Sequence, residues 1–259
     1  ISDQAGTLPR EQEQEILQAL LAAEHPIVIH ADGGVGKSVL AARLVASMPI
    51  GSEAVLYDCF GDGLYRSSIN FRHRHRDALV QIANELAAQG LCHPLIPTAY
   101  ADTKQYMRAF LHRLKQAVEL LRASAPEALL CLIIDAADNA EMAAEEQGEP
   151  SSFVRDLIRI PLPDGIRLAF TCRTHRRSRL GASPEAHEIE LRPFSENESA
   201  HHLRRFYPAA TGHDVAEFAI LSSSNPRVQA LVISQGLPLQ EMLRRLGPEP
   251  TTVDRTIGE

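Results

Sequence analysis

The sequence predicts an α/β fold, in which helices wrap a parallel sheet and a small helical unit follows. Up to residue 193, short apolar segments with strand character alternate with segments of helical spacing. One of them, Ala128–Asp135, is apolar up to its final acid, as in a strand buried on both faces of a parallel sheet. From Ser195 onwards only helical patterns follow. We therefore expect one domain over residues 1–193 and a helical domain over residues 194–259.

The expected elements alternate along the chain. Pro9–Glu24 has apolar residues at helical spacing, with a proline near its start. We expect strands at residues 26–31, 53–60, 128–135, 165–172 and 187–191, and helices at 39–46, 77–89, 102–123 and 151–160. The acidic segment Glu141–Pro150 is expected to be flexible. Ser195 and Glu198 form a capping-box pattern that opens the C-terminal helices.

Composition excludes some classes of function. The 259 residues suffice for one large α/β domain or for a domain with a smaller companion. A net charge of -7 argues against a dominant nucleic-acid surface, and no apolar run has the length of a membrane span. The chain begins at Ile1 and not at a methionine, and it shows no signal peptide, so we expect it to be a fragment.

The cysteines and histidines show no metal-ligand spacing. There are four cysteines, and three of them stand in apolar runs, which is typical of small buried side chains in a reducing compartment. We therefore expect a cytoplasmic location. His201 and His202 are adjacent on a predicted helix and cannot face the same way. We expect both to be structural or exposed.

A glycine-rich loop lies between the first predicted strand and the next helix. Residues 30–38 read His-Ala-Asp-Gly-Gly-Val-Gly-Lys-Ser, and strand, loop and helix in this order are the context of a P-loop. Backbone N–H groups of the loop and the helix N-terminus would bind phosphates. Lys37 would reach the β- and γ-phosphates, and the Ser38 hydroxyl would ligate Mg²⁺. The predicted nucleotide-binding residues are Asp32, Gly33, Gly34, Val35, Gly36, Lys37, Ser38 and Val39. Ala31 replaces the usual first glycine, so we expect a tight corner there and not a left-handed one.

Further charged residues follow the ends of later predicted strands. Asp135 ends a strand at the edge where α/β sheets bind ligands, and would hold Mg²⁺ together with Ser38. Asp138 would orient or deprotonate an attacking water, the alternative being a solvated loop acid. Arg173 would contact the γ-phosphate, the alternative being a surface arginine. We expect the other arginines nearby to be solvated: Arg176, Arg177 and Arg179. The basic cluster Arg72–Arg76 is also expected to be an exposed loop, the alternative being an interface or a phosphate contact from a neighbouring subunit.

The order of these motifs resembles that of the STAND NTPases, signal-transduction ATPases that include NACHT and NB-ARC modules. The P-loop is followed by Asp135–Asp138, Thr171–Thr174 and Leu191–Glu198. Leu8–Glu11 resembles the Arg-Glu segment that opens many such modules, and Ser224–Arg227 resembles a helical-domain motif centred on proline. The resemblance covers about residues 8 to 236. It is strongest to bacterial members, including those in antiphage defence.

This resemblance implies an ATP-binding switch module that hydrolyses ATP slowly, with ATP and Mg²⁺ as cofactors. Pro226 would close the adenine pocket from the helical side. Exchange of ATP and ADP would control assembly into a homo-oligomer, with effector and sensor domains outside this segment. Asn139 stands where NACHT modules usually have a second acid, which keeps a non-hydrolysing nucleotide-binding scaffold open.

Two other classes of protein stay open at this point. A small-molecule or nucleotide kinase would use Arg173–Arg179 as a lid, but no acceptor pocket is recognisable in the sequence. A DNA-acting motor fits poorly with the acidic balance and the lack of an aromatic-basic stripe. The preference for ATP over GTP is implied by the resemblance, since no Asn-Lys-x-Asp guanine-reading motif is present.

Overall fold

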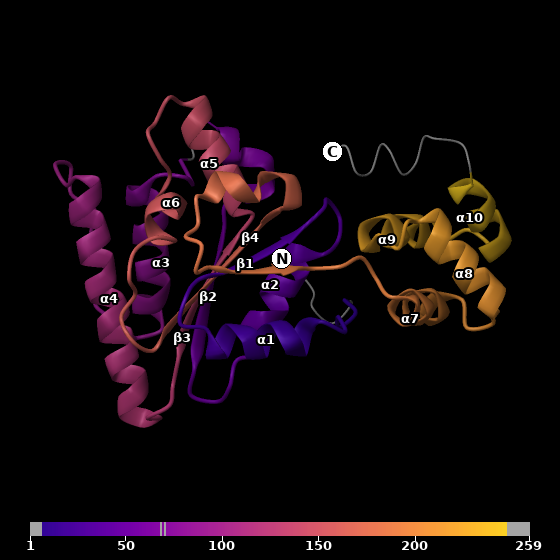
Figure 1. Cartoon of the computed structure of the whole chain (residues 1–259), viewed down its shortest axis with the longest axis horizontal. Helices are drawn as coiled ribbons and strands as arrows, with labels where there is room; N and C mark the ends of the chain where they lie inside the picture. Colours follow the sequence, from indigo (N-terminus) through magenta and orange to yellow (C-terminus); the bar gives the residue numbers. More distant parts are fainter. Residues whose placement is uncertain (1–6, 68, 70, 248–259) are drawn as a thin grey trace.

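The computed structural model describes residues 7–67, 69 and 71–247. A central sheet carries helices on both faces, and a group of C-terminal helices lies to one side of it (Figure 1). The strands are β1 (Ile27–Ala31), β2 (Glu53–Asp58), β3 (Leu130–Asp135), β4 (Ile166–Arg173) and β5 (His187–Glu190). Their order is β2-β3-β4-β1-β5, and every pairing is parallel. The expected parallel sheet is therefore present, with all five strands close to their expected positions.

The strand register brings several charged residues to one edge of the sheet. Asp58 pairs with Asp135 at the ends of β2 and β3, and Ala31 pairs with Arg173 at the ends of β1 and β4. Because all strands are parallel, their carboxyl ends share this edge, where α/β folds bind ligands. The P-loop strand lies next to β4, so β4 separates it from the strand that ends in Asp135.

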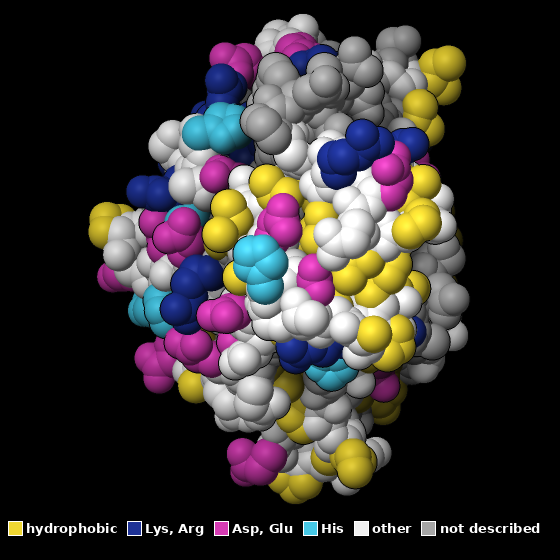
Figure 2. Space-filling view, turned by 90° about the vertical axis from the view of Figure 1, so that its right-hand side faces the viewer, with side chains coloured by type: hydrophobic (Ala, Val, Ile, Leu, Met, Phe, Trp, Pro, Cys, Tyr) yellow, Lys and Arg dark blue, Asp and Glu magenta, His cyan; other side chains and the backbone are white. Residues whose placement is uncertain are grey.

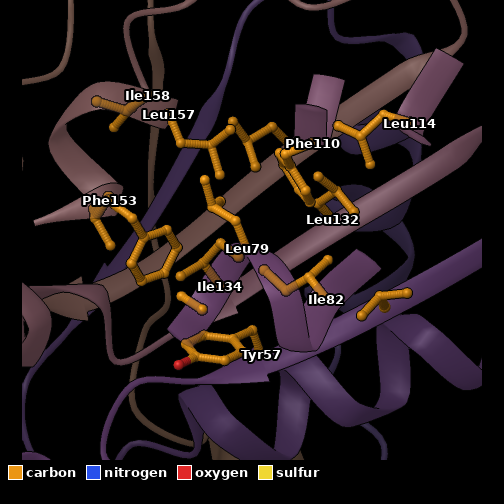
Figure 3. Packing of buried hydrophobic residues seen from close by; sticks show 14 of the residues in the cluster. Tyr57, Leu79, Ile82, Phe110, Leu114, Leu132, Ile134, Phe153, Leu157 and Ile158 are labelled. Atoms are coloured by element: carbon orange, nitrogen blue, oxygen red, sulfur yellow. The ribbon is translucent and has the colours of Figure 1, made fainter. Parts of the chain in front are cut away.

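Two apolar clusters explain how the sheet is covered. Side chains alternate between the faces of a strand, so β3 places Leu132 on one face and Ile133 on the other. The first face packs against α3 (His75–Ala88), α4 (Thr103–Ser124) and α6 (Phe153–Leu157), as Figure 3 shows for Tyr57, Phe110 and Phe153. The second face packs against α1 (Glu13–Ala22) and α2 (Lys37–Ala46). Cover on both faces explains the continuously apolar strand β3.

Helix α5 (Ala137–Glu146) corrects the expectation of a flexible acidic segment, which is wrong for residues 141–146. Buried alanines on one side of the helix, including Ala140 and Ala144, supply an apolar face that the acidic composition hides. Glu141 is itself buried, and it accepts a hydrogen bond from Ser152 Oγ at 2.5 Å. Burial and this partner hold the acidic side of the helix against the domain.

The Arg72–Arg76 cluster is the solvated loop expected from its charge only at Arg76, which is exposed, whereas its other residues are partly or fully buried. Arg72 donates to the Asp58 carbonyl at 2.6 Å and lies over the Tyr57 ring. His73 is 1% exposed, and its Nε2 lies 3.2 Å from a Glu149 carboxylate oxygen. Arg74 pairs with the same glutamate at 2.6 Å. These partners lie outside the cluster's own segment, so the residues next to the cluster in the sequence give no sign that it is partly buried.

The C-terminal helices form a unit that we call the helical module: α7 (Glu196–Phe206), α8 (Gly212–Leu221), α9 (Pro226–Ser234) and α10 (Leu239–Leu246). They enclose an apolar cluster of their own around Leu203, Phe218 and Val232. The capping box of Ser195 and Glu198 is present at the start of α7. The outer face of this side of the molecule mixes hydrophobic, basic and acidic side chains (Figure 2).

Two 3₁₀ segments, η2 (Gly61–Arg66) and η3 (Thr174–Leu180), follow β2 and β4 at the ligand-binding edge. The four cysteines are free thiols, and Cys59, Cys131 and Cys172 are buried as expected. Within the described segments, we find no helix that combines the length and the apolar character needed to cross a bilayer.

Candidate functional site

The glycine loop between β1 and α2 has the backbone that its glycines permit. Gly34 has φ +79° and Gly36 has φ +101°, both in the left-handed region that disfavours other residues. Ala31 ends β1 without a positive φ, as expected for the residue that replaces a glycine. Gly36 directly precedes α2, so the first N–H groups of that helix open towards the loop. Such a helix start binds anions.

Lys37 curls back over the loop. Its Nζ donates to the carbonyl oxygens of Ala31 at 2.8 Å and Asp32 at 2.9 Å. Burial lowers the pKa of the Lys37 ammonium, while the nearby carboxylates of Asp138 and Asp135 act to raise it. The lysine therefore lies within electrostatic reach of both candidate acids.

Asp135 is 2% exposed and is held by its neighbours on the sheet. Thr171 Oγ1 donates to Asp135 Oδ1 at 2.5 Å and accepts from the Ala136 N–H at 2.9 Å. Burial raises the pKa of this carboxyl, and hydrogen bonds from Ser38 and Thr171 act against the rise. The two predicted magnesium ligands, Ser38 and Asp135, thus lie together. Their hard oxygens fit Mg²⁺, which takes one or two protein ligands and completes its shell with phosphate and water.

Asp138 lies in the first turn of α5 and is 2% exposed, so the alternative of a solvated loop acid is wrong. Arg176 Nη1 lies 3.4 Å from Asp138 Oδ2, which also corrects the expectation that Arg176 is solvated. Sequence reasoning missed Arg176 because nothing local separates it from Arg177 and Arg179. The tertiary structure distinguishes Arg176 from the other two arginines, because η3 packs along α5 at this edge of the sheet.

A cavity of about 250 Å³ at the ligand-binding edge brings the predicted residues together. We call it the sheet-edge cavity. Its wall includes Lys37, Asp135, Asp138 and Arg173. The other lining residues are Gly33, Gly34, Ser38, Asp58, Phe60, Asp62, Ala136 and Asn139. Asp58 was not among the predicted site residues, although it ends a strand just as Asp135 does.

A second cavity, of about 480 Å³, lies between the glycine loop and the helical module. We call it the domain cavity. Three parts of the chain line it: the N-terminal residues Thr7, Leu8 and Arg10; the loop and α2 from Gly34 to Val39; and Phe194, His202, Pro226, Arg227 and Ala230. Gly34, Lys37 and Ser38 line both cavities. The predicted residues Val39 and Pro226 thus line the same cavity.

The helical module contacts the glycine loop directly. Asn225 Nδ2 donates to the Gly33 carbonyl at 2.9 Å, and the Arg227 N–H donates to the Gly34 carbonyl at 3.1 Å. The approach is close, since a Cβ atom on Gly34 would lie 2.6 Å from Asn225 Oδ1. Pro226 is carried between these two residues at the start of α9.

Arg10 joins the two units from the N-terminal side. Its guanidinium bonds Glu198 Oε1 at 2.9 Å, the Val35 carbonyl at 2.8 Å and the Arg192 carbonyl at 2.6 Å. It also lies 4.9 Å from the centre of the Phe194 ring. In the sequence, Arg10 stands out only as part of Leu8–Glu11, the segment that resembles the opening of many such modules. Its structural role is not visible there, because its partners are up to 188 residues away.

Sequence reasoning did not name His202 as a candidate binding residue. Expected to be structural or exposed, it lines the domain cavity. Its Nδ1 lies 3.1 Å from Gln229 Oε1 on α9. A contact between two helices leaves no local pattern, so no signal in the sequence could have found it.

Comparison with known proteins identifies the family to which this chain belongs. The NACHT domain profile matches residues 25–210, which is more than half of the chain. No curated protein matches the sequence. The chain therefore belongs to the NACHT domain family, as its resemblance to the STAND NTPases predicts.

Solved structures match the fold at low identity. A Walker-type ATPase of Pyrococcus abyssi is 14% identical, with a TM-score of 0.61 over 95% of this chain and 73% of that one. The Orc1 protein of Aeropyrum pernix, in complex with DNA, is 10% identical, with a TM-score of 0.54 over 95% and 67%. Cdc6p from Pyrobaculum aerophilum is 15% identical, with a TM-score of 0.51 over 94% and 65%. Together with the parallel sheet, these matches confirm the predicted α/β fold of the P-loop type, and the NACHT match identifies the chain as a STAND-class P-loop NTPase.

Proposed function

We propose that this chain is an ATP-binding switch module that hydrolyses ATP slowly and so controls the activation of a larger signalling or defence protein. One observation carries the proposal. Gly34, Lys37 and Ser38 line both the sheet-edge cavity and the domain cavity. A nucleotide can therefore place its phosphates at the sheet edge and its base under the helical module, in contact with both units at once.

In this proposal the phosphates bind the N–H groups of Asp32 to Val39 and the Lys37 ammonium. Asp135 and Ser38 hold Mg²⁺, which supplies charge neutralisation for the β- and γ-phosphates. Arg173 contacts the γ-phosphate. Asp138 orients the attacking water and accepts its proton, and the Arg176 guanidinium, 3.4 Å from this carboxylate, holds it in place.

The switch part of the proposal depends on the contacts between the units. Residues 1–193 would act as the nucleotide-binding domain and residues 194–259 as the moving helical domain. Asn225 and Arg227 bond the carbonyls of Gly33 and Gly34, so a nucleotide that changes the loop also changes what the helical module binds. ATP and ADP shift the two arrangements only by their difference in affinity for them. Pro226 and Arg173 are the proposed sources of that difference.

Several wider features belong to the same proposal and depend on the family. ATP-bound copies would assemble into a homo-oligomer, and effector and sensor domains would flank this segment. Action in the cytoplasm is supported by the four free thiols, which persist in a reducing compartment. Antiphage defence is the biological setting that the resemblance suggests.

A kinase is less well supported than a switch. Arg176 and Arg179 pair with Asp138 and Glu145 of α5, so they do not form a free arginine lid. A DNA-acting motor fits poorly with the net charge of -7. A non-hydrolysing scaffold is the second candidate, since Asn139 lines the sheet-edge cavity at the position of an expected acid.

The experiment combines calorimetric titration of ATP·Mg²⁺ with phosphate release, with and without added DNA. We expect Lys37→Ala to weaken ATP binding about 100-fold, because a charge-assisted contact to phosphate is lost. Lys104→Ala, at an exposed position on α4, is the matched control. Asp138→Asn should keep binding and slow phosphate release by a factor of about 100.

Other outcomes would change the proposal. Equal ATP affinity in the unaltered chain and in Lys37→Ala would overturn nucleotide binding at the glycine loop. Tight binding without turnover would favour the scaffold, and turnover stimulated by DNA would favour the motor.

A further inference from the structure

The ring of His202 is held firmly in the wall of the domain cavity. It makes edge contacts with Phe194, at 5.7 Å between ring centres and an angle of 82°, and with Phe206, at 6.2 Å and 75°. Its Nδ1 lies 3.1 Å from Gln229 Oε1. A ring fixed on both sides and hydrogen-bonded at one nitrogen presents its other nitrogen, Nε2, in a defined direction.

The orientation of the Gln229 amide follows from its other partners. Gln229 is fully buried, and its Nε2 lies 3.0 Å from Ser199 Oγ and 3.1 Å from Ser222 Oγ. The Ser222 hydroxyl donates its proton to the Phe218 carbonyl at 2.7 Å, so towards Gln229 it can only accept. The amide nitrogen must therefore face the serines, and the amide oxygen must face His202.

This arrangement assigns the tautomer of His202. Since Gln229 Oε1 is an acceptor, the proton of the neutral ring lies on Nδ1, and Nε2 carries a lone pair. Burial lowers the pKa of His202; the hydrogen bond to Gln229 acts against this and Arg205 acts with it, and the pKa stays below its usual 6.5, so the ring is neutral at pH 7. Within the described residues, Nε2 has no hydrogen-bond partner. His202 lines the domain cavity, and its Nε2 is an acceptor that no described residue uses.

We propose that His202 Nε2 accepts a hydrogen bond from the 6-amino group of a bound adenine and so selects ATP over 6-oxo purine nucleotides. The inference rests on the proposed function and names the residue that reads the base. The apolar surfaces of Leu8, Val39 and Pro226 in the same cavity suit a flat base, but they do not distinguish one purine from another. Guanine and hypoxanthine would place an oxygen acceptor against the Nε2 lone pair, and the pair would repel.

The first test needs no variant. Calorimetric titration of the unaltered chain compares ATP with purine riboside triphosphate, which has hydrogen in place of the amino group, and with inosine triphosphate. We expect ATP to bind about tenfold more tightly than purine riboside triphosphate, the value of one good hydrogen bond. Inosine triphosphate should bind more weakly still, because its oxygen faces the acceptor.

The second test changes the residue. His202→Phe keeps a flat ring between Phe194 and Phe206 but removes the acceptor, so ATP affinity should fall to that of purine riboside triphosphate, whose own affinity stays the same. His202→Gln restores a carbonyl acceptor and should recover part of the preference. His201→Phe, at the exposed neighbouring position, should leave the preference unchanged. Circular dichroism checks that each variant is folded.

The outcomes separate this inference from the proposed function. Equal binding of ATP and purine riboside triphosphate by the unaltered chain, with affinity that still depends on Lys37, would overturn the role of His202 and leave the switch intact. A preference for ATP that persists in His202→Phe would do the same. If no triphosphate binds, the proposed function and the inference fail together.

Discussion

The two cavities that meet at the glycine loop are built in different ways. The sheet-edge cavity takes charged side chains from strand ends, as with Asp58, Asp135 and Arg173, and from the helices that follow the strands, as with Lys37 and Asp138. The domain cavity takes its side chains from the N-terminal segment, from α2 and from the helical module. Strand pairing keeps the first cavity in place, whereas the second exists only while the module lies against the loop.

This difference shows which residues depend on the helical module for their position. Asp135 is fixed by Thr171 on the neighbouring strand, so its geometry does not depend on the module. His202 and Pro226 of the helical module share a cavity with Arg10 and the glycine loop only where the two units meet. In the proposed switch, the phosphates would bind in the cavity fixed by strand pairing and the base in the cavity that depends on the helical module, so the second cavity would sense the nucleotide.

We expect the largest effect on stability from removing the Arg10 side chain, which lines the domain cavity. In Arg10→Ala the buried Glu198 loses its ionic partner and keeps two backbone donors, the N–H groups of Glu11 at 2.8 Å and Ser195 at 2.7 Å. Removing one partner of a buried pair should lower the free energy of unfolding by about 3 kcal/mol. Urea titration followed by circular dichroism measures this, with the exposed Arg108→Ala as the control. A loss below about 1 kcal/mol, typical of a surface pair, would contradict a structural role for Arg10.

A second prediction concerns Gly34, which lines both cavities. Gly34→Ala forces a side chain into the left-handed region and against Asn225, which should lower the free energy of unfolding by about 2 kcal/mol. In an Asn225→Ala background the same change should cost less, because the atom it meets at 2.6 Å is gone. The matched substitution Gly36→Ala introduces the backbone strain alone, since its Cβ atom would meet Arg10 Nη1 only at 3.6 Å. Strictly additive costs at Gly34 and Asn225 in urea titrations would argue against their contact.

The third prediction tests the sheet-edge cavity by itself. Asp135→Asn preserves the shape of the side chain but removes the charge, so ATP affinity in Mg²⁺ should fall about tenfold. With the metal chelated, the variant should bind ATP at least as tightly as the unaltered chain, because the substitution removes a carboxylate that repels the phosphates. Calorimetry in magnesium and in chelator distinguishes the two conditions. A loss that is the same in both would mean that Asp135 acts on the nucleotide or the fold without the metal.

The smallest effect is a pH dependence of base selection. The pKa of His202 is lowered from its usual 6.5, so the ring stays neutral above that pH and gains a proton as the pH falls below it through the lowered value. A protonated Nε2 is a donor and cannot accept from the 6-amino group. The ratio of the affinities for ATP and purine riboside triphosphate should therefore be constant from pH 8 to pH 6.5 and decrease towards one at lower pH. The ratio cancels the titration of the phosphates, and in His202→Phe it should not vary with pH.

Much of the fold was predictable from the sequence by itself. Continuous apolar runs predicted β1, β3 and β4 because a sheet covered on both faces demands them, and all five expected strands, including the largely exposed β5, are present. The glycine loop and Asp135 were predictable because each combines a strand end with a residue type of known chemistry. Their roles in binding nucleotide and metal stay predictions. Family membership followed from the order of these local motifs along the chain.

Only the tertiary structure decided how the rest of the chain uses that site. It made α5 a packed helix, gave Asp138 the partner Arg176, and brought Arg10, Asn225 and His202 to the glycine loop. Local patterns report which face of a segment is apolar and which turns are possible, because those depend on neighbours in the chain. Contacts such as Asn225 with Gly33, 192 residues apart, depend on the path of the whole backbone, and no short stretch of sequence carries that information.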